Sequence, residues 1–157
     1  MPEHEVGDLA PEFELEAGDG ERVSLAGLLE LHKFVALAFF PAPGSEACSD
    51  EALVIEAVID DIERLGAGVI GISAADPDPV RAWSEELGLS YPVAADVDPL
   101  GGVAKSYGVY DEDGACKRAQ FVIDRDRRIQ LAHVVPREHS PGARALLKRL
   151  EELNAGG

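Results

Sequence analysis

Residues 34–51, FVALAFFPAPGSEACSDE, are the most informative part of the chain about its fold. This stretch opens with an uninterrupted apolar run over residues 34–40 that ends at Pro41, and a run this short indicates a buried β-strand. A turn of proline and glycine follows, and from residue 46 to residue 65 the apolar positions recur every three or four residues until Gly66. That spacing predicts an amphipathic helix, so the stretch combines a strand, a tight turn and a helix.

The same alternation of strands and helices continues along the chain. The sequence predicts further strands at residues 69–73, 91–95, 119–124 and 128–135, and further helices at residues 79–87, 99–107 and from Pro141, with Ser140 as the N-cap. Residues 13–25 alternate apolar and charged side chains around a Gly-Asp-Gly turn, which predicts an N-terminal β-hairpin. We therefore expect residues 1–157 to form a single three-layer α/β domain, with a central mixed β-sheet flanked by helices.

The composition is strongly acidic, with 30 Asp and Glu residues against 14 Lys and Arg residues and a net charge of -16. Since no basic run is present, the charge argues against nucleic acid and against anionic membrane surfaces as partners. A chain this negative repels itself unless salt screens it. We therefore expect a salt-adapted protein, although an ordinary acidic bacterial protein fits the composition as well.

Nothing in the sequence indicates export or insertion into a membrane. Residues 1–9 contain neither a basic region nor an apolar run, and no stretch approaches ~18 uninterrupted apolar residues. Two cysteines are too few for a disulfide-rich secreted scaffold. We therefore expect a cytoplasmic protein whose thiols are mostly reduced.

Cys48 is the candidate nucleophile. If Ser45 caps the helix, Cys48 occupies its third position, where free backbone N–H groups and the positive end of the helix dipole favour a thiolate. A cysteine standing alone would be interpreted as a small buried hydrophobic residue. Pro41, Ser45 and Cys48, however, together have the spacing P-x-x-x-(T/S)-x-x-C.

In its setting between a strand and a helix, this motif resembles the active-site motif of the peroxiredoxins of the AhpC/TSA type. Residues 6–13, VGDLAPEF, and residues 118–124, RAQFVID, are similar to two further motifs of the family, which more often has threonine at the positions of Ser45 and Gln120. The resemblance is greatest to the bacterioferritin-comigratory and one-cysteine AhpE-like members. It implies a thioredoxin-like fold and thiol-dependent reduction of hydrogen peroxide or organic hydroperoxides through a cysteine sulfenic acid.

The resemblance also implies a role for each residue of the site. Cys48 attacks the peroxide, Arg118 places a fixed positive charge beside the thiolate and the peroxide, and Ser45 donates its hydroxyl to a peroxide oxygen. Pro41 shields the sulfur, and Glu51 orients Arg118 through a bidentate pair. Simpler explanations stay open, in which Ser45 is only a cap, Pro41 only ends the strand, and the two charged side chains are solvated.

A sulfenic acid must be reduced, and the sequence leaves two routes open. Cys116 is the only other cysteine, and it lies either at the start of the strand predicted for residues 119–124 or in the loop before it. The acidic residues 111–113 and Gly114 indicate that this loop is mobile and exposed. Cys116 resolves Cys48 after a local rearrangement, or pairs with the other subunit of a dimer, if the Cα atoms come within ~7 Å. Alternatively, Cys116 is incidental and an external thiol, such as that of a thioredoxin-like protein, reduces Cys48. We favour this one-cysteine mechanism.

Neither a metal nor another cofactor is expected, because the chain has no C-x-x-C motif and its histidines are scattered at His4, His32, His133 and His139. By resemblance we expect a homodimer, with Trp83 as a core or interface anchor. Two other functions stay open on the same fold. One is a thioredoxin-like disulfide oxidoreductase, against which the missing C-x-x-C argues, and the other is a non-enzymatic thiol redox sensor or holdase.

Overall fold

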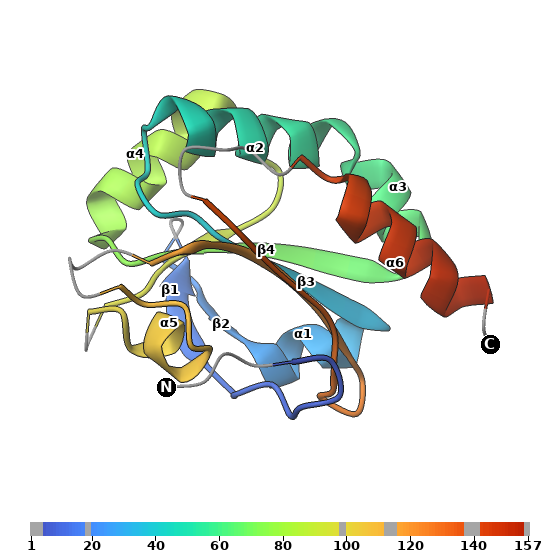
Figure 1. Ribbon diagram of the computed structural model, residues 1–157. Coiled ribbons are helices and arrows are strands. Elements are labelled where there is room, and N and C mark those ends of the chain that lie inside the picture. Colours follow the sequence, from blue (N-terminus) through green and yellow to red (C-terminus); the bar gives the residue numbers. More distant parts are fainter. Residues whose placement is uncertain (1–4, 18–19, 98–99, 112–115, 137–141, 156–157) are drawn as a thin grey trace.

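A seven-stranded mixed β-sheet runs through the molecule in the order β2-β1-β5-β4-β3-β6-β7. The computed structural model describes residues 5–17, 20–97, 100–111, 116–136 and 142–155 (Figure 1). The strands are β1 (Glu14–Ala17), β2 (Arg22–Ser24), β3 (Phe34–Phe39), β4 (Ala67–Ser73), β5 (Val93–Ala95), β6 (Arg118–Asp124) and β7 (Ile129–Val135). Strands β3, β4 and β5 run parallel, whereas the other neighbouring pairs are antiparallel.

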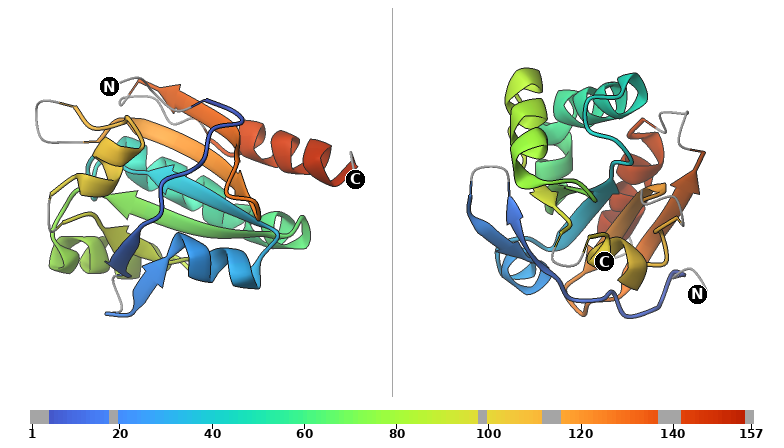
Figure 2. Two further views of the ribbon diagram at one scale, coloured as in Figure 1. Left: turned by 90° about the horizontal axis from the view of Figure 1, so that it is seen from below. Right: turned by 90° about the vertical axis from the view of Figure 1, so that its left-hand side faces the viewer.

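Helices cover both faces of this sheet. They are α1 (Leu25–Leu31), α2 (Glu46–Ala57), α3 (Ile59–Arg64), α4 (Pro77–Leu87), α5 (Gly102–Ser106) and α6 (Arg144–Ala155). Helices α2, α3, α4 and α6 pack on one face, and α1 and α5 on the other, each face with its own apolar cluster (Figures 1 and 2). The predicted mixed sheet flanked by helices is therefore confirmed. Within the described residues, no helix is both long and apolar enough to cross a membrane.

The N-terminal β-hairpin extends the central sheet. Strands β1 and β2 pair antiparallel with Leu15 opposite Val23, as the alternating sequence predicts. The other edge of β1 pairs with β5, where Glu16 lies opposite Ala95. The hairpin is thus held by a third strand, which a two-stranded hairpin needs for stability in water.

The long helix predicted for residues 46–65 is two helices. Helix α2 ends at Ala57, and Val58, with φ -114° and ψ 15°, leaves the helical conformation before α3 begins. The bend turns Ile62 into the core, where it is fully buried, whereas Val54 is 41% exposed. The apolar residues of this stretch cover more than one side of a straight helix, so the chain bends to bury the second half.

The C-terminal helix α6 begins at Arg144, three residues later than the predicted Pro141; Ser140 and Pro141 lie outside the described residues. Leu146 and Leu150 are buried in the cluster on the α2 face, as the apolar spacing predicts. The helix packs against β6 and β7 and so covers the half of the sheet that α4 leaves open.

Candidate active site

The end of β3 is fixed before the chain turns toward α2. The Phe40 N–H donates to the carbonyl of Ile72 at 2.9 Å, and the Ser73 hydroxyl donates to the carbonyl of Phe40 at 2.7 Å. Pro41 follows and is half-buried. The turn then passes through Gly44, whose φ of +92° suits glycine because that residue has no Cβ. The predicted turn thus joins two elements that are each anchored.

Ser45 caps α2, as the sequence predicts. Its backbone is extended, with φ -71° and ψ 152°, and its hydroxyl oxygen accepts a hydrogen bond from the Cys48 N–H at 3.2 Å. Cys48 is therefore the third residue of the helix and lies in the turn at the positive end of the helix dipole. The structure thus has the capped helix start that the sequence predicts for Cys48.

Strand β6 brings Arg118 to Cys48 from a distant part of the chain. It runs antiparallel to β3 with Ala119 opposite Phe39, so Arg118 lies beyond the end of β3. The Arg118 side chain is 1% exposed, and Nη1 donates to Oε1 of Glu51 at 2.7 Å. Burial by itself lowers the pKa of Arg118, but the hydrogen bond to Glu51 and the charge and hydrogen bond of Cys48 outweigh it and raise that pKa. The guanidinium therefore stays charged between the sulfur and the carboxylate.

Glu51 is fully buried and lies one turn along α2 from Cys48. Its Oε1 accepts from Arg118, and its Oε2 accepts from Nε2 of Gln120 at 3.0 Å. Burial raises the pKa of Glu51, whereas the hydrogen bonds from Arg118 and Gln120 and the charge of Arg118 lower it. The alternative of solvated charged side chains is excluded for this pair, because neither residue reaches solvent.

Cys48 is itself fully buried. It belongs to the apolar cluster on the α2 face together with Phe40 and Trp83, while its sulfur interacts with Arg118. Trp83 packs edge-on against Phe40 and donates from Nε1 to the hydroxyl of Ser49 at 3.0 Å, so it is a core anchor beside the site. Cys48 exposes no part of its surface to solvent.

The prediction of an exposed Cys116 is wrong. Cys116 is fully buried, forms an antiparallel bridge with Tyr110, and packs with Phe39 and Tyr107 on the face of α1 and α5. The expectation of a mobile loop rested on residues 111–114, of which residues 112–114 lie outside the described residues. The position of Cys116 is determined by the apolar residues of the sheet and α5 that surround it, and not by the acidic run that precedes it in the sequence.

The environment of Cys116 disfavours its ionisation. Burial raises the pKa of Cys116 to about 12, and the charges of Cys48 and Asp96 add to the rise. The thiol is therefore neutral near pH 7. Cys48 and Cys116 belong to the apolar clusters on opposite faces of the sheet, so a bond between them requires one of the two to leave its cluster.

Two further buried polar residues, Asp96 and Gln120, have no role that the sequence predicts. Asp96 accepts hydrogen bonds from the N–H groups of Val103 and Ala104 at 2.9 and 2.8 Å, and so holds the start of α5; burial raises its pKa while these bonds lower it. Gln120 points to the same side of β6 as Arg118 because the two are separated by one residue. The alternation of side chains along the strand is therefore the sequence signal from which a place for Gln120 beside Arg118 could have been predicted.

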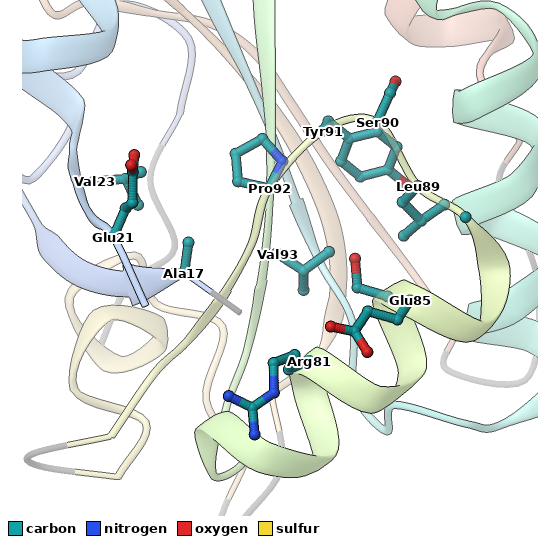
Figure 3. Close-up of a pocket in the computed structure, with 12 residues that line it drawn as sticks. Ala17, Glu21, Val23, Arg81, Glu85, Leu89, Ser90, Tyr91, Pro92 and Val93 are labelled. Atoms are coloured by element: carbon teal, nitrogen blue, oxygen red, sulfur yellow. The ribbon is translucent and has the colours of Figure 1, made fainter. Parts of the chain in front are cut away.

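A surface hollow of about 380 Å³ lies elsewhere, between the β-hairpin, α4 and the segment leading into β5 (Figure 3). Its charged lining residues are Glu21, Arg81 and Glu85. None of the predicted site residues lines it, so this hollow and the environment of Cys48 are separate features of the molecule.

Known proteins share this sequence pattern and fold. The chain matches the AhpC/TSA family over residues 6–132. It is 31% identical over 130 residues to alkyl hydroperoxide reductase E of Mycobacterium tuberculosis, which covers 82% of this chain and 84% of that protein. The crystal structure of peroxidoxin BcpB from Mycobacterium tuberculosis is similar with a TM-score of 0.81 and 31% identity over 96% of each chain. AhpC from the same organism, at 20% identity, has a TM-score of 0.88 over 99% of this chain and 96% of that chain.

These similarities define the class of protein first. The seven-stranded mixed sheet with its flanking helices has the thioredoxin-like fold of the peroxiredoxins. The sequence match is more specific: the chain belongs to the AhpC/TSA family of peroxiredoxins. The resemblance seen in the Pro41-to-Cys48 motif is thus confirmed at the level of the family.

Proposed function

We propose that this protein is a thiol-dependent peroxidase that reduces hydrogen peroxide or organic hydroperoxides at Cys48. The observation that carries the proposal is the buried assembly of Cys48, at the capped end of α2, with Arg118 from β6 and Glu51 from the same helix. It supplies a nucleophile that is stabilised as an anion and a fixed cation beside it. The related alkyl hydroperoxide reductase E carries the matching activity in its name.

The chemical step is a displacement at oxygen. The Cys48 thiolate attacks one oxygen of the peroxide, the O–O bond breaks, and the sulfur becomes a sulfenic acid. The other oxygen leaves as hydroxide or alkoxide and takes up a proton to give water or an alcohol. Arg118 stabilises the negative charge as it moves from sulfur to the leaving oxygen, and the Ser45 hydroxyl donates to the peroxide while its oxygen keeps the cap of α2. Pro41, which lacks an N–H, shields the sulfur.

An external thiol then reduces the sulfenic acid in two steps. The first thiol forms a mixed disulfide with Cys48 and releases water, and a second thiol restores the Cys48 thiolate. The burial and neutrality of Cys116 support this route over direct resolution by Cys116. We propose a thioredoxin-like protein as the donor, in a homodimeric enzyme of the cytoplasm. Thioredoxin-like disulfide exchange by this chain is less well supported, because Cys48 has no second cysteine on its own helix.

Rapid mixing of the reduced protein with one equivalent of hydrogen peroxide tests the proposal. Trp83, the only tryptophan of the chain, donates to the neighbour of Cys48 and reports the reaction by fluorescence. Cys48→Ser should slow peroxide consumption by at least about a thousandfold, whereas Cys116→Ser should leave the first turnover unchanged. Mass spectrometry should find one added oxygen on Cys48. Retention of the wild-type rate in Cys48→Ser would contradict the proposal.

A further inference from the structure

Gln120 connects the Cys48 site to the entrance of α6. The side chain is 1% exposed, and its Nε2 donates both to Oε2 of Glu51 at 3.0 Å and to the carbonyl of Gly142 at 2.8 Å. Gly142 lies two residues before α6, and the following Ala143 is buried in the cluster on the α2 face. One amide group therefore bridges a catalytic helix and a segment from the other end of the chain.

The arrangement has a cost in stability. The Oε1 atom of Gln120 is buried and has no hydrogen-bond partner among the described residues. A buried polar atom without a partner destabilises the fold, so an apolar side chain of similar size would avoid the loss at this atom. The Nε2 group of Gln120, by contrast, uses both of its N–H donors, one on Glu51 and one on the carbonyl of Gly142.

We infer that Gln120 is a positioning residue of the Cys48 site, and that through Gly142 it makes the reactivity of Cys48 depend on how the chain enters α6. The inference rests on the proposed peroxidase function. Gln120 holds the Oε2 side of the Glu51 carboxylate, so that Oε1 stays directed at Arg118 and Arg118 stays beside Cys48. The Gly142 carbonyl fixes the Gln120 amide in turn.

A substitution at Gly142 offers a second way to disturb the hydrogen bond between Gln120 and the segment before α6. Its φ is +66°, in the region that side chains with a Cβ rarely adopt, and a Cβ added there would meet nothing within 4 Å. Gly142→Ala therefore displaces the backbone through strain and not through a clash. Gly88, at the end of α4, is a matched control because its φ is +67° and its surroundings are equally open.

The test measures the rate constant of Cys48 oxidation by hydrogen peroxide in four single variants and one double variant, with urea unfolding of each. Gln120→Met, which keeps the size and removes the donors, should react about tenfold more slowly than wild type. Gln130→Met is its control: that residue lies on β7 and bonds Asp124 and Arg149, so its loss should affect stability alone. Gly142→Ala should slow the reaction, whereas Gly88→Ala should not.

The double variant decides whether the two residues act through one connection. If they do, adding Gly142→Ala to Gln120→Met produces no further slowing, because the link is already broken. Two independent effects that multiply would overturn the inference, as would a wild-type rate in Gln120→Met. A wild-type protein that fails to oxidise at Cys48 would instead remove the proposed function itself, so the two failures are distinguishable.

The pH profile of the rate separates positioning from a general loss of packing. The ionisable groups that interact with Glu51 are Arg118 on β6 and Tyr91 ahead of β5, and Cys48 interacts in turn with Arg118. The hydrogen bond from Gln120 lowers the pKa of Glu51, so Gln120→Met should raise that pKa. Because the Glu51 carboxylate holds Arg118 beside Cys48, its protonation slows the reaction, and the acid limb of the rate profile should move to higher pH. An unshifted acid limb in Gln120→Met would overturn the route through Glu51.

Discussion

The two cysteines of this protein are both fully buried, yet their surroundings differ in one respect. Cys48 lies at the N-terminal turn of α2, where the helix dipole and Arg118 face its sulfur. Cys116 packs among aromatic and aliphatic side chains such as Phe39 and Tyr107, without a cation among the causes that set its pKa of about 12. Burial is thus common to both cysteines, whereas a neighbouring cation acts on Cys48 and not on Cys116.

Burial therefore has opposite effects on the two thiols of this fold. Around Cys116 the loss of water penalises the thiolate and keeps the thiol inert. Around Cys48 the same loss of water strengthens the attraction between sulfur and guanidinium, because little solvent screens it. Variants that change the charge at Cys48, the ionisation of Cys116 and the cap of α2 test this difference in turn.

The largest effect is expected from removing the charge. Arg118→Met should lower the rate constant of Cys48 with hydrogen peroxide by about a hundredfold or more, since the anionic sulfur and the leaving oxygen lose their cation. It should also lower the free energy of unfolding by about 3–5 kcal/mol, because Glu51 is left buried without its partner. Stopped-flow kinetics and urea titration measure the two effects.

Two matched variants control this prediction. Arg118→Met combined with Glu51→Gln should recover stability but not rate, because the buried charge is removed while the cation is still missing. Arg64→Met, which breaks an exposed pair with Asp61, should change stability by less than about 1 kcal/mol. A near-normal rate in Arg118→Met would show that the helix terminus alone activates Cys48.

An intermediate effect is expected from the ionisation of Cys116. Because its pKa is raised from the ordinary 9.0 to about 12, the unfolded chain loses this proton before the folded protein does. The contribution to stability is therefore complete below pH 9 and is lost as the pH rises toward 12, at roughly 1.4 kcal/mol per pH unit. The unfolding free energies of wild type and Cys116→Ala, compared at several alkaline pH values, measure it. A constant difference between the two proteins would contradict the prediction.

The smallest effect is expected from the cap of α2. Ser45→Ala should reduce the free energy of unfolding by about 1 kcal/mol, because the Cys48 N–H loses its acceptor. The peroxide rate constant should fall about tenfold, since the substrate also loses a hydroxyl donor. Ser45→Thr keeps both the cap and the hydroxyl and should behave like wild type. Equal rates for the alanine and threonine variants would limit Ser45 to its role as a cap.

Local sequence patterns are sufficient to predict most of the fold and the position of the candidate nucleophile, Cys48. The apolar run of residues 34–40, the cap at Ser45 and the third helical position of Cys48 all follow from neighbouring residues, and all agree with the structure. The bend at Val58 and the burial of Cys116 could not be predicted in the same way. Both depend on what the helix and the strand pack against, and that surface is assembled from distant segments.

The strand, the turn and the capped helix that present Cys48 follow from the local sequence, because each is fixed by contacts within a few residues. Long-range packing, by contrast, buries the pair of Arg118 and Glu51, ties this pair to Gly142 through Gln120, and makes Cys116 an inert core thiol. The reason is physical: the charge and water that surround a side chain are set by residues far away in the sequence. Antiparallel pairing of β3 with β6 brings those residues together.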